Sequence, residues 1–448
     1  MPPPNITGKL HMGHALFLTL QDALSRFYKN SGHSTLWIPG LDHAGLATHE
    51  KIIKFQKKEK ISYEEASFKL SNCHKEIILN QITKIGALPD WKYLTYTLDP
   101  EYQEFTLKIL KLLYDEDRIF LQNGDIFLNL KDLALELADD MKSGQFDITP
   151  SYEIKNLLPF LENLEPWNIS RQIPWGTSLP FKIIEDKLQW SSEGNLGSLD
   201  TWFNSSLYPL ASLIKHPELL EYYPAELIET GADILFFWCG KMLMMSNYIY
   251  KNQHKLGLTL SDKYAFKKIY LHGIIRDKNG DKFSKTLGNG IDPLDIIAKY
   301  GSDATRLFLA TRTGPSEDII FKEDELIIYK KFMNKIWQSA RFFSMYAAKA
   351  EMEKLDSRLM PNNLKIKELQ ELYCQQMNQF KFLEASRMIH SEFKSFFCDQ
   401  WIEENKAKIQ ALDKQTITDG ILILDQMLAM MEPFCPYICH AIKEKFFK

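Results

Sequence analysis

Hydrophobic residues recur at helical spacing close to the beginning of the chain. Leu16, Leu20, Leu24 and Phe27 lie three to four positions apart, which predicts a helix after a turn rich in Gly and His. Residues 35–38 are a short β-like run that is followed directly by a Pro-Gly pair, so a short strand is predicted there. The chain is therefore expected to begin with a turn, a helix and a strand.

The middle of the chain alternates between helical and irregular patterns. Residues 48–121 are charged and predicted helical, with a turn over residues 86–90, and resemble an inserted helical region. Several prolines predict irregular structure over residues 159–181, and helix returns over residues 233–250. Residues 268–275 combine β-branched and aromatic side chains, as a buried strand does.

The last part of the chain shows no strand pattern from Glu323 onward. Apolar residues recur there at helical spacing, at Ile336, Ala340, Phe343, Ile421, Leu424, Leu428 and Met431. This spacing predicts a helix bundle, with a domain boundary near residues 313–316.

Length and composition narrow the class of protein. A chain of 448 residues suggests two to three domains, and 45% hydrophobic with 12% aromatic residues excludes a disordered chain. The formal net charge of −4 argues against a strongly basic nucleic-acid binder, so any RNA contact must be local. Six scattered cysteines, no leader pattern and no long apolar run predict a cytoplasmic location and no membrane partner.

The first chemical feature is the turn before the N-terminal helix. His11 and His14 lie three positions apart at a helix start, where backbone N–H groups favour anions, so both could donate hydrogen bonds to phosphate. Gly13 allows close approach of a ligand to the backbone. The alternative is a capped helix with two surface histidines. A metal pair is the weaker functional choice, and no metal site is predicted, because no further ligand cluster is evident in the sequence.

The second feature is a pair of lysines after the predicted strand over residues 268–275. An Asn-Gly turn precedes Lys282 and Lys285, which lie between Gly280 and Gly288. A short loop of this kind suits the clamping of a group that develops negative charge. A lysine pair alone is usually a solvated surface, and the strand and the two glycines argue against that interpretation here.

Together these features resemble the two signature sequences of class I aminoacyl-tRNA synthetases, in His11-Met-Gly-His14 and Lys282-Phe-Ser-Lys-Thr286. Further stretches resemble the valyl-tRNA synthetases in particular, at residues 2–8, 39–48, 169–172, 199–203, 230–238, 288–293 and 300–304. The resemblance implies an α/β fold, with a Rossmann-like parallel-sheet catalytic domain over residues 1–315. Residues 48–170 would be a shortened connective insertion, and residues 316–448 an all-α domain like those that bind anticodons.

The resemblance also implies a role for each matched residue. Asp42 would hold the α-ammonium of the amino acid, and the pocket around it would be formed by Pro3, Asn5, Trp202, Ile234 and Trp238. ATP would be bound by Gly13, Gly231, Asp233, His272, Gly273 and Ser284. The catalytic residues would be His11, His14, Lys282 and Lys285. Taken singly, the tryptophans and Ile234 also fit a plain core, and Asp42 a turn.

The implied reaction joins an amino acid to AMP. The carboxylate attacks the α-phosphorus of ATP and pyrophosphate leaves, with catalysis by positioning and by the charges of the histidines, the lysines and Mg²⁺. The aminoacyl group would then pass to tRNA. The expected ligands of this monomer are valine or a similar small branched amino acid, ATP, Mg²⁺ and tRNA.

Three differences from the family pattern modify this expectation. Between Ile119 and Trp167 a short segment stands where the family carries an editing domain, so no editing is expected. Neither the family's C-terminal coiled-coil arm nor the first strand of its nucleotide-binding sheet is matched, which predicts weaker tRNA binding and an unpaired sheet edge. A hydrophobic pocket separates valine from threonine by only ~10²-fold, so threonine should be activated and not corrected.

Two other functions fit the same residues. The chain could transfer the activated amino acid to a carrier protein or a small amine in place of tRNA. It could also be an inactive relative that binds nucleotide or RNA without turnover. The intact His and Lys positions of the two signature segments favour an enzyme.

Overall fold

The computed structural model describes residues 1–283, 290–352, 361 and 363–447. Contacts divide the chain into two compact units. Unit 1 contains residues 1–9, 36–80 and 89–272, and unit 2 contains residues 10–35, 81–88 and 273–448. Contacts alone define these units, and the domain boundary near residue 315 remains a prediction.

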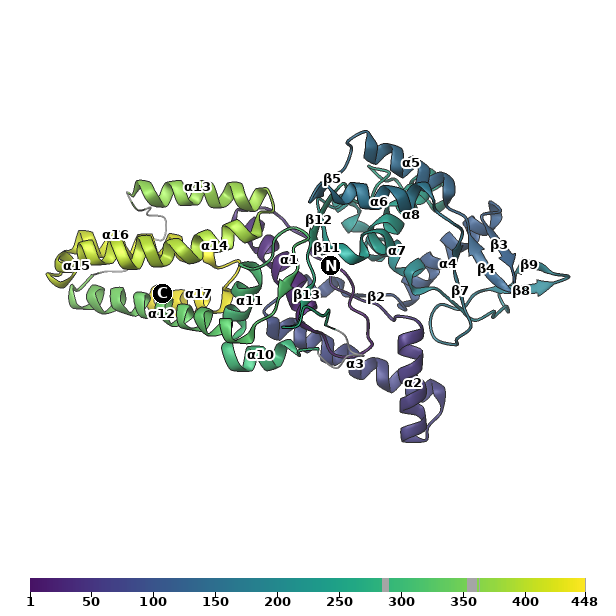
Figure 1. Cartoon of the computed structure of the whole chain (residues 1–448), viewed down its shortest axis with the longest axis horizontal. Helices are drawn as coiled ribbons and strands as arrows, with labels where there is room; N and C mark the ends of the chain where they lie inside the picture. Colours follow the sequence, from purple (N-terminus) through teal and green to yellow (C-terminus); the bar gives the residue numbers. More distant parts are fainter. Residues whose placement is uncertain (284–289, 353–360, 362, 448) are drawn as a thin grey trace. The chain divides into compact units, whose positions relative to one another are not determined.

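A three-stranded parallel sheet carries part of the predicted site in unit 1 (Figure 1). β12 (Lys268–His272) is the middle strand, between β11 (Ile228–Gly231) and β5 (Asp147–Thr149). Gly231 lies opposite His272, so β11 and β12 end side by side. β12 is buried after its first residue, as is typical of a central parallel strand. The parallel sheet confirms the predicted α/β class.

The predicted strand over residues 268–275 is two separate strands. β12 ends at His272, and β13 (Ile275–Arg276) pairs in parallel with β14 (Ile319–Ile320) in unit 2. The chain crosses the segment before β14 at Gly273, where a Cβ atom would lie 1.9 Å from the carbonyl oxygen of Glu317. Only glycine allows two backbones to come this close.

The predicted helix over residues 233–250 contains three helical types. A 3-10 turn, η3 (Ala232–Ile234), leads into a π-helix, η4 (Leu235–Gly240), and then into α8 (Lys241–Lys251). α8 packs against α7 (Thr201–Ile214), and most residues of both helices are buried. π-Helical turns are rare and occur frequently at functional sites.

The predicted helical insertion contains strands as well as helices. Its helices are α2 (Leu46–Glu59), α3 (Tyr63–Ile85), α4 (Pro100–Asp115), α5 (Lys131–Lys142) and α6 (Glu153–Glu162), with the short turn η1 (Trp91–Tyr93). β3 (Ile119–Gln122), β4 (Asp125–Leu128) and β6 (Trp167–Asn168) form an antiparallel sheet that was not predicted. The turn predicted over residues 86–90 follows α3, as expected.

Two local predictions were wrong. Residues 35–38 form no strand, because both backbone groups of Trp37 bond to Asp90: its N–H donates to the side-chain Oδ2 (2.7 Å), and its carbonyl accepts from the backbone N–H (3.0 Å). Residues 159–181 are not irregular throughout, because α6 continues past Pro159 to Glu162.

The remaining elements of unit 1 are β1 (Gly40–Leu41) paired with β2 (Thr95–Tyr96), β7 (Ser170–Arg171) with β10 (Ser198–Leu199), β8 (Phe181–Ile184) with β9 (Lys187–Trp190), η2 (Pro217–Tyr222) and α9 (Gln253–Leu256).

A buried ion-pair network joins α1 (Met12–Asn30) to α11 (Ser302–Ala310) in unit 2. The Asp22 carboxylate accepts hydrogen bonds from Arg26 Nε (2.7 Å), Arg306 Nη2 (2.6 Å) and the backbone N–H of Leu88 (2.9 Å). Arg306 is 1% exposed and also donates to two backbone carbonyls at residues 433 and 434. Three segments of unit 2 therefore meet at the Asp22 carboxylate, and Arg306 joins a fourth to them.

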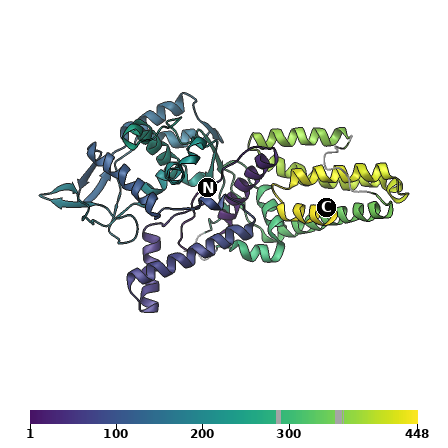
Figure 2. The ribbon, with the colours of Figure 1, turned by 180° about the vertical axis from the view of Figure 1, so that it is seen from behind.

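The C-terminal part of unit 2 is a helix bundle, as predicted. The long helices α12 (Leu326–Lys349), α13 (Leu364–Asn378), α14 (Phe382–Glu392) and α16 (Lys414–Met431) run side by side in Figures 1 and 2. The bundle is completed by η5 (Glu323–Glu325), η6 (Phe393–Ile402), α15 (Glu403–Gln410), α17 (Pro436–Ile442) and η7 (Lys443–Phe447), and α10 (Pro293–Tyr300) precedes α11. The described residues from Glu323 onward contain no strand.

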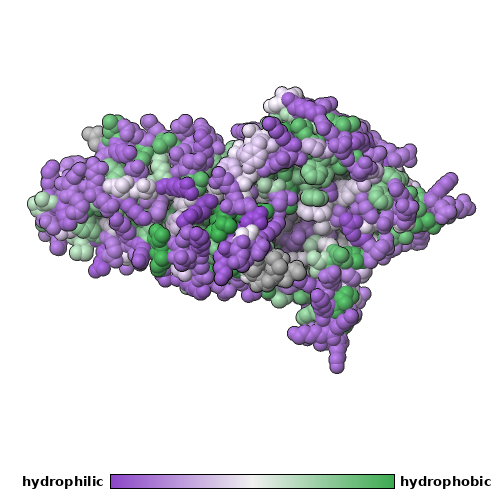
Figure 3. Space-filling view, in the orientation of Figure 1, coloured by the Kyte–Doolittle hydropathy of each residue, from purple (hydrophilic) through white to green (hydrophobic). Residues whose placement is uncertain are grey.

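The surface of the bundle agrees with the pattern in the sequence. Hydrophilic side chains cover most of its visible face in Figure 3. Of the apolar positions that predicted the bundle, Ile421 is half-buried and the others are buried. None of the described helices combines the length and the hydrophobicity that a membrane-spanning helix requires.

The Asp22 network predicts that removing this carboxylate lowers the stability of the protein strongly. We expect Asp22→Ala to lower the free energy of unfolding by about 3–5 kcal/mol, because the buried Arg306 cation loses its counter-ion. Urea denaturation followed by circular dichroism measures the change. Asp399→Ala is the control, because it removes the exposed Lys335–Asp399 pair, and it should cost about 0–1 kcal/mol. Equal losses in both variants would contradict the role given to Asp22.

Candidate functional site

The predicted site residues fall in both units. Unit 1 contains Pro3, Asn5, Asp42, Trp202, Gly231, Asp233, Ile234, Trp238 and His272. Unit 2 contains His11, Gly13, His14, Gly273 and Lys282. Ser284 and Lys285 lie outside the described residues.

The two histidines of the first signature segment cap α1 in unit 2. His11 is the N-cap residue, and its Nδ1 accepts a hydrogen bond from the backbone N–H of Gly13 (3.1 Å). The Nδ1 of His14 accepts from the backbone N–H of His11 (3.2 Å), and the two ring centroids are 4.0 Å apart. A neutral imidazole whose Nδ1 accepts carries its proton on Nε2. Both rings are thus held as Nε2–H donors.

The structure gives a reason for glycine at position 13 that the sequence did not reveal. A Cβ atom at this position would lie 2.9 Å from Cε1 of the His11 ring, so glycine makes room for the capping imidazole. The preceding residue, Leu10, is held by Gln81, whose Oε1 accepts from its backbone N–H (2.7 Å). Gln81 also donates to Asp292 Oδ1 (3.0 Å), the N-cap residue of α10. Gln81 thus positions the turn before the histidines, and sequence reasoning missed it.

The described part of the lysine loop is a tight hairpin in unit 2. Arg276 pairs with Lys282 across the predicted turn, and the Asp277 carboxylate accepts from the backbone N–H groups of Asn279 (2.9 Å) and Asp281 (3.0 Å). Lys282 is exposed at the end of this hairpin. Before the hairpin, Asp318 accepts a hydrogen bond from the backbone N–H of Ile274 (2.7 Å). These contacts fix the strand side of the loop.

Asp42 has a buried carboxylate in unit 1 that accepts hydrogen bonds from three donors. Its carboxylate is 1% exposed and accepts from the backbone N–H of Ala44 (2.6 Å), from Thr201 Oγ1 (2.7 Å) and from Ser205 Oγ. The backbone of Asp42 forms a parallel bridge with the exposed Asn5. Its N–H donates to the carbonyl of Pro4, and its carbonyl accepts from the N–H of Ile6. Within the described residues no lysine or arginine forms an ion pair with this buried carboxylate.

The predicted walls of the amino-acid pocket lie on α7 and the η3–η4 segment. Trp238 is buried, and its Nε1 donates to the backbone carbonyl of Ser205 (3.2 Å). Trp202 and Ile234 are half-buried, and the Trp202 ring lies 6.3 Å from the ring of Phe237. The hydrogen bond from Trp238 ties the π-helix to the same residue of α7 that contacts Asp42.

The predicted nucleotide residues gather where β11 and β12 end. His272 Nδ1 is hydrogen-bonded to the carboxylate of Glu229, and both side chains are buried. At Gly231, a Cβ atom would lie 2.7 Å from Asp233 Oδ1 and 3.5 Å from His272 Nε2. Glycine thus leaves space between a carboxylate and an imidazole nitrogen. Glu229 was not predicted, because only strand pairing places it beside His272.

A buried lysine lies among the aromatic residues of the same unit. The ammonium of Lys241 is 3.6 Å from the centre of the Trp167 ring and 6.0 Å from that of Trp202. Burial lowers the pKa of Lys241 to about 8, and the nearby Asp200 carboxylate opposes that shift. Asp200 itself accepts from Trp167 Nε1 (2.8 Å) and forms an ion pair with Arg171. The cation is therefore held mainly by aromatic faces.

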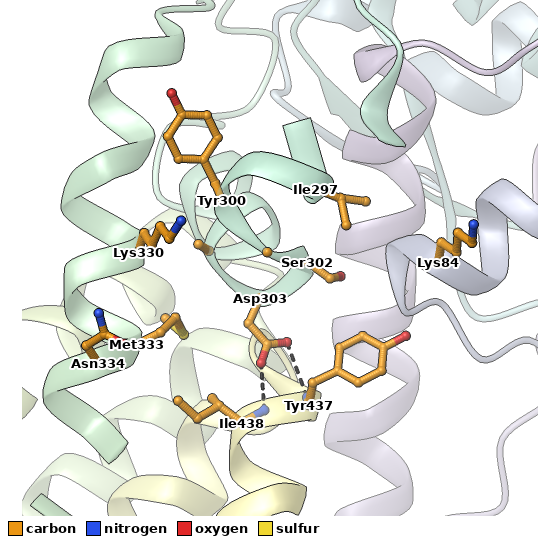
Figure 4. Close-up of a pocket in the computed structure, with 12 residues that line it drawn as sticks. Lys84, Ile297, Tyr300, Ser302, Asp303, Lys330, Met333, Asn334, Tyr437 and Ile438 are labelled. Carbon is orange, nitrogen blue, oxygen red and sulfur yellow. Dashed lines mark hydrogen bonds between the residues drawn. The ribbon is translucent and has the colours of Figure 1, made fainter. Parts of the chain in front are cut away.

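Unit 2 also contains a hollow that is lined by other residues. It has a volume of about 630 Å³, and Lys84 and Lys330 lie on opposite sides of it in Figure 4. Asp303 accepts hydrogen bonds from the backbone N–H groups of Tyr437 (3.2 Å) and Ile438 (2.6 Å) at the start of α17. Burial raises the pKa of Asp303 to about 6. None of the predicted site residues that the structure describes lines this hollow.

The described residues contain no group of three or more His, Cys, Asp or Glu side chains that could hold a metal ion. This result concerns only a site built by the protein. Mg²⁺ commonly binds through substrate phosphates with one or two carboxylates.

Comparison with protein families gives one match that covers more than half of the chain. A family model described as class I tRNA synthetases (I, L, M and V) matches residues 1–126 and 185–322. The unmatched residues 127–184 contain α5, β5 and α6. Residues 127–170 of this stretch belong to the part of the sequence predicted to be a shortened insertion.

Individual relatives agree with the family match. The chain is 24% identical to the valine–tRNA ligase of Fervidobacterium nodosum, over 99% of this chain and 75% of the relative, and 25% identical to that of Thermotoga maritima, over 99% and 75%. The first alignment spans 665 positions although the chain has 448 residues, so the relative has internal segments that this chain lacks.

Solved structures share the fold. A leucyl-tRNA synthetase from Agrobacterium radiobacter K84, in a ternary complex with tRNA and LeuAMS, superposes with a TM-score of 0.75 at 15% identity, covering 99% of this chain and 84% of that one. A methionyl-tRNA synthetase from Mycobacterium tuberculosis bound by methionyl-adenylate gives a TM-score of 0.73 at 16% identity, covering 98% and 92%.

The buried Lys241 predicts a pH-dependent cost in stability. Because the fold lowers its pKa from 10.5 to about 8, the unfolded chain binds more protons between these values, and wild-type stability rises with pH there. We expect Lys241→Met to raise the free energy of unfolding by about 1–3 kcal/mol at pH 7. This gain should shrink as the pH rises from 8 to 10.

Urea denaturation of both proteins at pH 7 and pH 9.5 tests this expectation. Lys251→Met is the matched control, because Lys251 belongs to the same helix but its side chain is 47% exposed. It should change stability by less than about 1 kcal/mol at either pH. A destabilised Lys241→Met protein at pH 7 would show that the aromatic contacts outweigh the cost of burial.

Proposed function

Because this chain belongs to the class I tRNA synthetases of the I, L, M and V group, we propose that it activates valine, or a similar small branched amino acid, with ATP and transfers it to tRNA without editing. The family supplies the class of enzyme, a ligase with ATP as a substrate. The identities of the amino acid and the acceptor rest on the residues described above and on the valine–tRNA ligases among the relatives.

One observation carries the proposal for the amino-acid site. Asp42 is a carboxylate that is almost fully buried, and its partners are two hydroxyl groups and one backbone N–H. A buried charge without a counter-ion is costly, so the site favours a ligand that brings a cation. The α-ammonium of an amino acid is such a cation. Asp42 would therefore bind the group that all amino-acid substrates share.

The side chain of the substrate would be selected by shape. Trp202, Ile234 and Trp238 are contributed by α7 and the η3–η4 segment, and Pro3 precedes the residues that pair with Asp42. Rigid apolar walls exclude a longer side chain, but they discriminate weakly between side chains of equal size. This supports a small branched substrate such as valine.

The nucleotide would bind at the ends of β11 and β12. Asp233 and the space at Gly231 suit the ribose. His272, which lies opposite Gly231, and the next residue, Gly273, would contact the adenine. Glu229 would hold the His272 ring in place through Nδ1. The ends of parallel strands are the usual location of nucleotide sites in α/β folds.

The triphosphate would be bound by the signature residues. The Nε2–H groups of His11 and His14 are donors at the start of α1, and Lys282 and Lys285 would add positive charge. The amino-acid carboxylate attacks the α-phosphorus and pyrophosphate leaves. Mg²⁺ would arrive on the phosphate oxygens of ATP and would neutralise part of their charge.

The proposal that the protein does not edit rests on the segment between β4 and β6, where the family carries an editing domain. This segment contains only α5, β5 and α6, and it lies in the range that the family model leaves unmatched. The long alignment with the Fervidobacterium relative supports the same proposal. A chain without a hydrolytic editing site must discriminate between amino acids by the amino-acid pocket alone.

The first test of the proposal is ATP–pyrophosphate exchange with each amino acid. We expect valine to support exchange. Threonine should also support it, with an efficiency lower by only about 10²-fold, because an apolar pocket discriminates weakly between two side chains of the same shape. With tRNA added, threonyl-tRNA should persist, and rapid deacylation would contradict the absence of editing. Exchange without any transfer to tRNA would indicate another acceptor, and no exchange with any amino acid would indicate an inactive relative.

The second test concerns the nucleotide site. We expect Gly231→Ala to raise the KM for ATP at least tenfold, because its Cβ would displace the Asp233 carboxylate, while the KM for the amino acid changes less than twofold. Gly240→Ala is the control, since its Cβ would make only an ordinary contact, 3.6 Å from Leu157. If Gly231→Ala left the KM for ATP unchanged, the nucleotide would not bind there.

A further inference from the structure

We propose that Thr201 and Ser205 are positioning residues for amino-acid binding, because their hydroxyl groups orient the carboxylate of Asp42 toward the α-ammonium of the substrate. This inference rests on the function proposed above. Neither residue was predicted from the sequence, and the signature segments do not include them. Their role follows from hydrogen bonds within unit 1.

The two hydroxyl groups come from one face of α7. Thr201 is the first residue of the helix and Ser205 lies four positions later, so their side chains are neighbours on the helix surface. Thr201 Oγ1 donates to Oδ1 of Asp42 (2.7 Å), and Ser205 Oγ donates to Oδ2. Each carboxylate oxygen is thus held by a different hydroxyl, which fixes the rotation of the carboxylate plane.

The number of acceptor positions leaves room for one more donor. An ionised carboxylate has about four lone-pair sites. Oδ1 of Asp42 accepts from Thr201 and from the backbone N–H of Ala44, and Oδ2 accepts from Ser205. One site on Oδ2 therefore remains for an N–H group of the ammonium, and the three existing bonds determine its direction.

Neutral partners suit this task better than a charged one. A lysine or arginine beside Asp42 would neutralise the carboxylate and would compete with the ammonium of the substrate. A hydroxyl group donates one hydrogen bond and leaves the net charge in place. Thr201 and Ser205 can therefore hold the carboxylate in the free protein without reducing its attraction for a cation.

Ser205 also connects this carboxylate to the wall of the amino-acid pocket. Its backbone carbonyl accepts a hydrogen bond from Trp238 Nε1 (3.2 Å), while its side chain donates to Asp42. The distance between the ammonium position and one apolar wall is therefore set through a single residue of α7. A change at the hydroxyl should alter amino-acid binding and leave ATP binding intact.

The test measures ATP–pyrophosphate exchange in Thr201→Val and Ser205→Ala proteins. We expect the KM for the amino acid to rise roughly tenfold or more in each, as for the loss of a hydrogen bond to a charged group. The KM for ATP should change less than twofold. Thr201→Ser keeps the hydroxyl and should restore the KM for the amino acid to within about threefold of wild type.

Ser206→Ala is the matched control on the same helix. Ser206 is buried like Ser205, but its hydroxyl donates to the backbone carbonyl of Phe203 (2.7 Å) and does not contact Asp42. This variant should behave as wild type in both KM values. A second measurement uses valinol, which keeps the amine, and 2-hydroxy-3-methylbutanoate, which lacks it, as competitive inhibitors.

The inhibition constant of valinol should rise in Thr201→Val and Ser205→Ala, and that of the hydroxy acid should not. The inference is overturned if both inhibitors weaken equally, if Thr201→Ser fails to restore binding, or if the variants match Ser206→Ala. Failure of the proposed function looks different, because wild-type protein would then show no exchange with any amino acid. If Ser205→Ala does not fold, Thr201→Val and Thr201→Ser still decide the outcome.

Discussion

The burial of the Asp42 carboxylate is the constraint on which the amino-acid side of the site depends. A charge removed from water must be surrounded by hydrogen-bond donors, and here these come from its own turn and from the first helical turns of α7. The backbone of Asp42 also pairs with residues 4–6. Three stretches far apart in the sequence are therefore held in one arrangement before any ligand binds.

Close packing explains two of the glycines predicted to bind ATP, Gly13 and Gly273, in two different ways. Gly13 makes room for a ring of the protein, since the His11 imidazole folds back over it as a helix cap. Gly273 makes room for another backbone, that of Glu317 before β14. In both cases the glycine serves the local fold first, and any ligand contact depends on a geometry that the protein has already fixed.

Much of the fold could be predicted from the sequence, because periodicity is a local signal. The N-terminal helix, the turn after α3 and the C-terminal bundle follow it closely. The strand expected at residues 35–38 failed because Trp37 bonds with Asp90, 53 residues away. Thr201, Ser205 and Glu229 were missed for the same reason, since a hydroxyl or carboxylate gains its role only from a partner that folding brings close.

The Arg306 network has a consequence for how the protein is made. The guanidinium bonds to Asp22 near one end of unit 2 and to the carbonyls of residues 433 and 434 near the other. During synthesis on a ribosome, α1 emerges several hundred residues before those carbonyls exist. Unit 2 therefore cannot satisfy its buried cation until residues 433 and 434 have been synthesised. Until then the hydrogen bonds of Arg306 are incomplete, although all of unit 1 has already been synthesised.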